Sequence, residues 1–146
     1  TLSLFRVCLL RADAVADWRP LLQLSEEVLA VPMREIVLAR EDQLVRLRQD
    51  WLAARGAVLC RQGRYQEAID CLRQGVSQER KAGNDAARVF LAYAHLRLGQ
   101  KAEARRWLDA ALVPKAEVNF SWAALEVELL RPTVVELQKE TRAPGK

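Results

Sequence analysis

The side chains best suited to catalysis are few in this sequence and widely spaced. His95 is the only histidine, and no Ser or Cys stands at a spacing that would make it a nucleophile beside this base. Glu126 and Glu128 are two residues apart on an expected helix, so they point in different directions and do not pair for acid–base chemistry. The sequence also contains no Gly-rich phosphate loop. These patterns predict a protein that is not an enzyme.

The sequence also gives no sign of a metal site or of a membrane-spanning segment. Cys8, Cys60 and Cys71 form no CxxC pair and lie in apolar helical patterns, which is typical of reduced, buried thiols in a cytoplasmic protein. Together with a single histidine they make no recognisable ligand set, so no metal and no cofactor are expected. The apolar run from Leu2 to Leu10 is interrupted by Arg6 and is too short to span a bilayer.

Composition narrows the class of fold. Of the 146 residues, 51% are hydrophobic but only 6% are aromatic, a profile that favours an all-α domain over a sheet protein. The net charge of +4 is spread along the chain, which is weak support for nucleic-acid binding. Because the chain begins with Thr and opens on an apolar helical stretch, we expect a segment of a longer protein whose first repeat is incomplete.

The elements that position these side chains follow a repeat. Small and large residues return at one fixed offset, 36 residues further along the chain. The five matches are Gly56 with Ala92, Gly63 with Gly99, Ala68 with Ala104, Leu72 with Leu108, and Gly75 with Ala111. A period of this size is typical of helix pairs that bury their apolar faces by stacking on their neighbours.

The repeat predicts one domain over residues 1–140, made of three helix pairs and a capping helix, with a disordered tail at 141–146. The expected pairs cover about residues 2–31, 33–78 and 85–113, and the capping helix covers 121–131. The helix after residue 85 is expected to bury Val89, Phe90, Leu91, Ala94 and Leu98.

Local signals set several helix ends. Gly63 and Gly99 are expected to end the first helices of the second and third pairs. Asp17 is a candidate N-cap for a helix starting at Trp18. Thr133 with Glu136 could open one more short helix through a capping box.

The stretch from Met33 to Gln62 leaves two alternatives open. The aromatic residues Trp18 and Tyr65 are 47 residues apart, eleven more than the later period. Eleven residues make three helical turns, so the extra length could extend one continuous helix that projects beyond its neighbours. The alternative is a helix break between Val37 and Asp42.

These patterns resemble the tetratricopeptide repeat. The segment RGAVLCRQGRYQEAIDCLRQG carries Gly56, Gly63, Tyr65, Ala68 and Leu72 at matching places. The copy FLAYAHLRLGQKAEARRWLDAA matches less fully, because Lys101 replaces the usual aromatic residue. The resemblance implies a right-handed solenoid of helical hairpins, which commonly binds a protein segment in the concave groove formed by the first helix of each pair. More narrowly, the chain looks like the C-terminal repeat regions of large multidomain bacterial proteins.

The resemblance also indicates which residues would line the groove. The carboxylate clamp of one family subgroup is absent, and a small, mostly apolar groove with two guanidinium groups is expected. The groove residues are Ala53, Ala57, Arg61, Val89, Tyr93 and Arg97, with neighbouring positions at Ala54, Cys60, Phe90 and Leu96 and a possible rim at Arg64 and Arg105. These residues favour an adaptor or scaffold that binds an apolar segment carrying acidic groups.

Three other interpretations stay open. Arg61 and Arg97 could simply be solvated ends of helices that favour the C-terminal dipole. The arginines of the long helix could contact phosphates, although acidic residues interleave with them and favour a solvated helix face; these are Arg34, Arg40, Arg46, Arg48 and Arg55. An incomplete first repeat could also expose apolar surface that a second copy of the chain covers.

Overall fold

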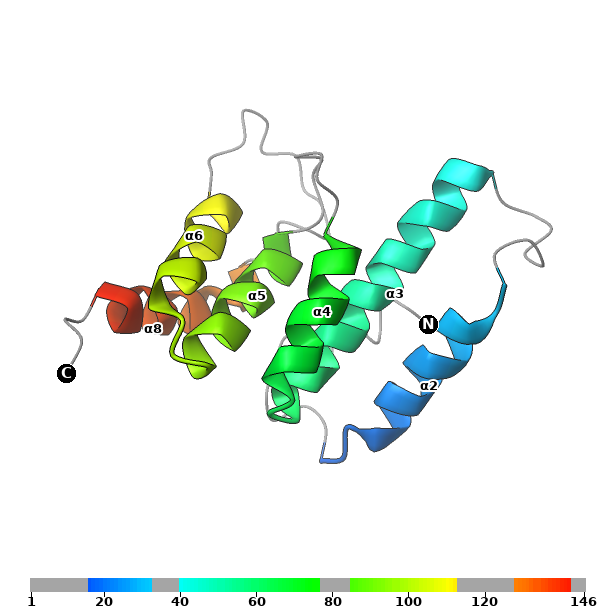
Figure 1. Ribbon diagram of the computed structural model, residues 1–146, viewed down its shortest axis with the longest axis horizontal. Coiled ribbons are helices and arrows are strands. Elements are labelled where there is room, and N and C mark those ends of the chain that lie inside the picture. The colour runs from blue at the N-terminus through cyan, green and yellow to red at the C-terminus, as the bar shows by residue number, and fades with distance from the viewer. Residues whose placement is uncertain (1–15, 33–39, 77–84, 113–127, 143–146) are drawn as a thin grey trace.

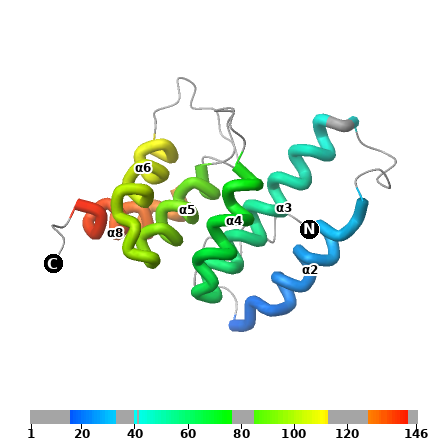
Figure 2. Tube along the Cα trace, in the orientation of Figure 1, coloured from blue at the N-terminus to red at the C-terminus, as the bar shows by residue number. Residues whose placement is uncertain are grey.

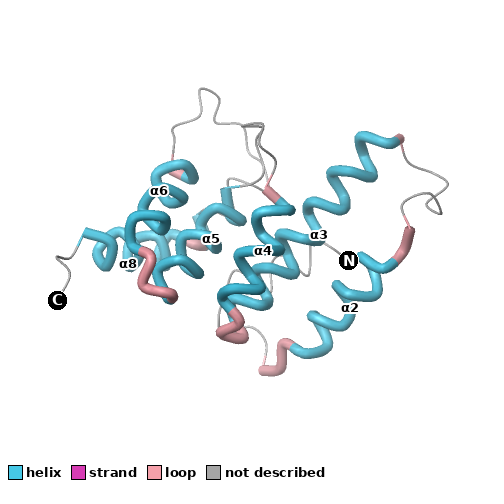
Figure 3. Tube along the Cα trace, in the orientation of Figure 1, coloured by secondary structure: helices cyan, strands magenta, loops and turns pink. Residues whose placement is uncertain are grey.

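The computed structural model describes residues 16–32, 40–76, 85–112 and 128–142, and within them the chain is all-helical with no strand (Figure 3). The helices are α2 (Arg19–Ala30), α3 (Glu41–Arg61), α4 (Tyr65–Gly75), α5 (Asp85–Arg97), α6 (Lys101–Ala111) and α8 (Arg131–Arg142). The all-α class expected from composition and from the repeat is confirmed.

Consecutive helices pack as hairpins that stack on one another. Helix α3 pairs with α4, α5 pairs with α6, and α4 lies against α5, so that the two hairpins share a core (Figure 1). Helix α2 packs on α3 at one end, and α8 packs on α5 and α6 at the other, as the trace from blue to red shows (Figure 2). This arrangement is consistent with a tetratricopeptide helical repeat.

The same turn closes both hairpins. Gly63 follows the C-cap of α3 with φ 77°, and Gly99 follows α5 with the same φ. The N–H of Gly63 donates to the carbonyl of Cys60 at 3.1 Å, and the N–H of Arg64 donates to the carbonyl of Leu59 at 2.9 Å. These bonds form a Schellman motif, which contains one residue in the left-handed conformation that only glycine adopts readily. The expected helix ends at both glycines are confirmed.

Glycine also sets how closely α3 and α4 approach. A Cβ atom added to Gly75 would lie 2.6 Å from the backbone nitrogen of Ala53 on α3. A Cβ added to Gly56 would lie 2.4 Å from Cγ of Leu72 on α4. The two helices therefore touch through backbone at one crossing and through a fully buried leucine at the other.

Helix α3 does not run back to Met33. Arg40 has φ −68° and ψ 152°, an extended conformation, and its N–H donates to Oε1 of Gln43 at 3.3 Å. The helix therefore begins at Glu41, so the expectation of one continuous helix from 33 to 62 is wrong and the alternative break between Val37 and Asp42 holds. Residues 33–39 lie outside the described residues.

The first turns of α3 still extend past both neighbouring helices. Gly75, the last residue of α4, lies beside Gln49 and Ala53. The guanidinium of Arg48 reaches the carbonyl of Leu29 near the end of α2. The turns before Arg48 thus lie beyond these contacts, and Val45 there is 44% exposed.

Other helix ends differ slightly from the expectation. Helix α2 begins at Arg19, one residue later than expected. The N–H of Arg19 donates to Oδ1 of Asp17 at 3.0 Å, so the Asp17 side chain accepts a hydrogen bond from the first turn of the helix. Helix α8 begins at Arg131, which places Thr133 inside the helix rather than at an N-cap, and the expected capping box is wrong. The same helix continues through Thr141 to Arg142, two residues into the expected tail.

The remaining expectations concern Leu98 and the helices near the two ends of the chain. Leu98 follows the last residue of α5 and is 39% exposed, so it does not join the core as expected. The helices expected over residues 2–14 and 121–127 lie outside the described residues, and the single domain over 1–140 stays a prediction.

Replacing Gly75 by Ala is expected to lower the free energy of unfolding by about 1–3 kcal/mol, because a methyl group would press on the α3 backbone. Helix propensity alone would change the free energy of unfolding in the opposite direction, because it favours Ala over Gly by about 1 kcal/mol. Urea unfolding followed by circular dichroism measures the change. Gln66→Ala, on the exposed face of α4, is the control and should change stability little. A Gly75→Ala chain as stable as wild type would contradict the close crossing.

Candidate functional site

The first helices of the two hairpins place the expected groove residues in two rows. Helices α3 and α5 contact each other directly, and each carries its three residues at intervals of four. Ala57 is 2% exposed and Val89 is 1% exposed, because both pack between the helices. These two residues therefore present almost no surface, while Ala53 is half-buried beside Gly75.

The remaining groove residues come together with two aromatic neighbours in what we call the arginine–aromatic cluster, which is made of Arg61, Tyr65, Phe90, Tyr93 and Arg97. The guanidinium carbon of Arg61 lies 5.4 Å from the centre of the Phe90 ring, and that of Arg97 lies 4.9 Å from the centre of the Tyr93 ring. The rings of Tyr65 and Tyr93 meet edge to face, with centres 6.1 Å apart and planes inclined at 68°. Both cation–π distances are in the range where the attraction is significant.

Burial and hydrogen bonding shift the pKa values of the two guanidinium groups in opposite directions. Burial lowers the pKa of Arg61, which is half-buried above the core. A hydrogen bond with Tyr93 is the main cause that raises the pKa of Arg97, which is exposed. Both groups stay charged near neutral pH, because arginine loses its proton only at far higher pH. A guanidinium that stacks on a ring keeps in-plane N–H groups, which can donate to a carboxylate.

This geometry bears on the alternative that Arg61 and Arg97 are only solvated helix ends. Both residues do lie in the last turns of their helices, where a cation favours the dipole. Each also lies over an aromatic ring, a contact that contributes about 0.5–1 kcal/mol at an exposed site. Tyr65, which the sequence marked only as the aromatic residue after the turn, belongs to the cluster through its contact with Tyr93.

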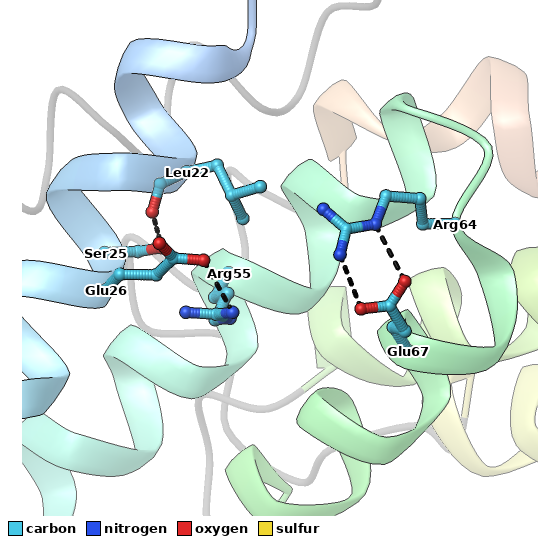
Figure 4. Close-up of polar contacts among 6 residues, drawn as sticks. All are labelled: Leu22, Ser25, Glu26, Arg55, Arg64 and Glu67. Atoms are coloured by element: carbon cyan, nitrogen blue, oxygen red, sulfur yellow. Dashed lines mark hydrogen bonds and ion pairs between the residues drawn. The ribbon is translucent and has the colours of Figure 1, made fainter.

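The two expected rim residues form ion pairs with acids three and four residues further along the chain. Arg64 forms a two-point contact with Glu67, at 2.8 Å and 2.5 Å, on the first turn of α4 (Figure 4). Arg105 lies 3.9 Å from Asp109 on the exposed face of α6. Among the described residues, Glu67 and Asp109 are the ion-pair partners of these two arginines.

The arginines of α3 serve partly to hold α2. Arg55 forms an ion pair with Glu26 at 2.9 Å, beside the buried Ser25, whose hydroxyl donates to the carbonyl of Leu22 at 2.6 Å (Figure 4). Arg48 donates to the carbonyl of Leu29 on the same helix. These two side chains are thus directed to α2, whereas Arg40 and Arg46 are exposed. Arg34 lies outside the described residues.

His95 is part of the packing between α5 and the turn that follows it. The residue is 3% exposed, and its Nδ1 lies 2.5 Å from Oε1 of Gln100. Within the described part of the chain, Nε2 of His95 and Nε1 of Trp107 are buried without a hydrogen-bond partner. His95 is therefore a buried residue between α5 and the turn that follows it.

The described part of the chain has neither a cluster of metal ligands nor a membrane-spanning helix. In ranges 16–32, 40–76, 85–112 and 128–142, no group of three or more His, Cys, Asp or Glu side chains could hold a metal ion. No helix in these ranges combines the length and apolar character needed to cross a membrane.

The stacked hairpins define a helical repeat protein, and comparison with known families makes the class more specific. Residues 59–126 match the tetratricopeptide repeat family, over a stretch that includes α4, α5 and α6. Tetratricopeptide repeats generally act as protein-interaction modules, and no catalytic family matches. No curated protein and no solved structure gives a significant match. The narrower likeness to large multidomain bacterial proteins receives no support from these comparisons.

Cys60, the residue before Arg61 in the chain, leads to a pH prediction. Its thiol is 2% exposed, donates to the carbonyl of Phe90 at 3.7 Å, and burial raises its pKa to about 12. In the unfolded chain a thiol titrates near pH ~8.5. Between these values the unfolded state binds fewer protons than the folded state, so Cys60 makes stability fall as pH rises.

The stability gap between wild type and Cys60→Ala is therefore expected to narrow above about pH 9, by about 1.4 kcal/mol per pH unit. Urea unfolding at pH 7, 8, 9 and 10 under reducing conditions measures this gap. Tyrosines, lysines and the other thiols titrate in both chains and cancel in the difference. A gap that stays constant from pH 7 to pH 10 would show that the thiol ionises as easily folded as unfolded.

Proposed function

We propose that the chain is a non-catalytic adaptor or scaffold module that binds an acidic segment of a partner protein at the arginine–aromatic cluster. The observation that carries this proposal is the pair Tyr93 and Arg97, an exposed guanidinium stacked on a ring one repeat away from Arg61. A stacked arginine is already ordered before binding, so a partner carboxylate meets a preorganised donor. The family match over residues 59–126 supports a protein partner in general.

The chemistry of the cluster suggests what the partner segment carries. The faces and edges of Tyr65 and Tyr93 favour apolar side chains, and the two guanidinium groups favour carboxylates. A segment with both, in an extended or helical conformation, fits the cluster best. The expectation that the parent protein is bacterial and cytoplasmic stays a prediction.

Two alternatives are less well supported. Binding of nucleic acid along α3 would use a row of free arginines, but Arg48 and Arg55 hold α2 instead. Self-association through an incomplete first repeat has no observation in its favour, because residues 1–15, which would form the first helix of that repeat, lie outside the described residues.

The proposal predicts that peptides selected for binding contain acidic as well as apolar residues. A phage-displayed random library selected on the full chain provides such peptides, and fluorescence anisotropy gives their affinities. Arg97→Gln should weaken binding about tenfold, because it removes one charge-assisted hydrogen-bond donor. Tyr93→Ala should weaken it further, because the ring that orders Arg97 is lost.

The matched control is Arg106→Gln, which removes an exposed arginine of α6 outside the cluster and should change affinity less than about twofold. Peptides without acidic residues, or peptides unaffected by Arg97→Gln, would overturn the proposal. A steep loss of affinity for single-stranded DNA with added salt would instead favour the nucleic-acid alternative.

A further inference from the structure

The ring on which Arg97 stacks is itself in contact with a residue of the other hairpin. Helix α4 of the first hairpin, which α3 and α4 form, lies against α5 of the second (Figure 1), and Tyr65 is the first residue of α4. The Tyr65 ring meets that of Tyr93 edge to face, with ring centres 6.1 Å apart. This contact between two tyrosines therefore exists only when the hairpins are stacked.

The two guanidinium groups of the cluster are held in different ways. Arg61 lies over Phe90, a ring on the next hairpin, so its stacking contact already joins two helices. Arg97 is exposed and lies over Tyr93, one turn earlier on its own helix. A pair of side chains four residues apart on one helix is only weakly stabilising by itself. A contact that reaches Tyr93 from outside α5 therefore matters more for Arg97 than for Arg61.

The backbone determines where the Tyr65 ring can lie. Gly63 takes the left-handed conformation with φ 77°, and the N–H of Arg64 donates to the carbonyl of Leu59 at 2.9 Å, so the turn into α4 is fixed. Tyr65 follows directly and is half-buried, and a tyrosine side chain has only two rotatable bonds to its ring. Lys101 stands at the equivalent position after the turn of the second hairpin, so only the first of these two hairpins supplies a ring there.

We propose that Tyr65 is a positioning residue of the proposed site, which holds the Tyr93 ring in the orientation on which the Arg97 guanidinium stacks. The proposal rests on the proposed function, because ordering Arg97 matters only for a partner that binds to it. Tyr65 then links the site to the stacking of the hairpins, so that a partner meets an ordered guanidinium only when α4 lies against α5. By linkage, a bound acidic segment favours that stacking in return.

Nuclear magnetic resonance of the full chain tests the positioning without any partner. Protons of Arg97 that lie over the Tyr93 ring give signals shifted upfield by the ring current, and Arg97→Gln identifies these signals by their loss. Tyr65→Leu keeps an apolar side chain but removes the ring, so it should move the Arg97 signals toward those of an exposed arginine such as Arg106. Tyr65→Phe keeps the ring and should restore the upfield shift. Gln66→Leu, at the next and exposed position of α4, is the control and should leave the signals unchanged.

Two results of this measurement would overturn the proposal. One is a set of Arg97 signals that Tyr65→Leu leaves unchanged, and the other is a shift lost as fully in Tyr65→Phe as in Tyr65→Leu. Urea unfolding of the same variants shows whether each still folds. If Tyr65→Leu does not fold, Tyr65→Lys takes its place in the measurement, because the second hairpin forms with Lys101 at the equivalent position.

A double-mutant cycle with the acidic peptide selected on the wild-type chain tests the link to binding. Tyr65→Leu should weaken peptide binding about two- to fivefold in the wild-type background but less than about twofold in the Arg97→Gln background, because Tyr65 acts through Arg97. Equal losses in both backgrounds would overturn the proposal while the proposed function stands. If Arg97→Gln has no effect on the peptide, the proposed function fails, and the resonance signals still decide whether Tyr65 orders Arg97.

Discussion

The close crossing of α3 and α4 is the constraint on which the rest of the described structure depends. Gly75 allows the backbone of α4 to touch Ala53, and Gly56 leaves room for the fully buried Leu72. Two helices this close share a long contact, and the left-handed Gly63 then returns the chain within a few residues. Because Tyr65 starts α4 directly after this turn, the same geometry brings its ring to Tyr93 on the next hairpin. The cluster is thus a consequence of how tightly the first hairpin closes.

The second hairpin shows how the repeat tolerates variation at this constraint. Ala92 and Ala111 stand where the first hairpin has Gly56 and Gly75, and both alanines are buried. A methyl group at each crossing point is accommodated there, so α5 and α6 have room that α3 and α4 lack. The turn, in contrast, keeps its glycine in both copies, since a φ of 77° strains any side chain whatever space surrounds it. The strain of a left-handed residue lies in its own backbone and cannot be relieved by its neighbours, whereas crowding between two helices can be relieved by a small shift of one helix.

The sequence predicted the hairpins well because their signals are local, and it predicted the helix starts less well. Gly63 and Gly99 are turn residues whose effect needs no neighbour. The break at Arg40 has no such mark, since no Gly or Pro stands between Val37 and Asp42 and the apolar spacing continues across it. Thr133 shows the converse, because a capping-box pattern was present but the helix had already begun at Arg131. Helix starts depend on which backbone groups tertiary packing leaves unpaired, and a single sequence does not contain that information.

The candidate site shows the same difference between local signals and effects of tertiary packing. The positions on α5 that the resemblance assigned to the groove differ in burial, because Val89 is buried whereas Tyr93 is half-buried and Arg97 is exposed. A first helix lies between its own partner and the next hairpin, so burial extends almost all around it, and its apolar pattern does not mark a single outward side. What distinguishes the outward residues is chemistry rather than period: a guanidinium cannot enter the core unpaired, so it lies over a ring at the edge of the contact. The stacking that makes Arg97 compatible with a tightly packed repeat therefore also leaves its guanidinium at the surface, which is the property that the proposed binding of an acidic partner requires.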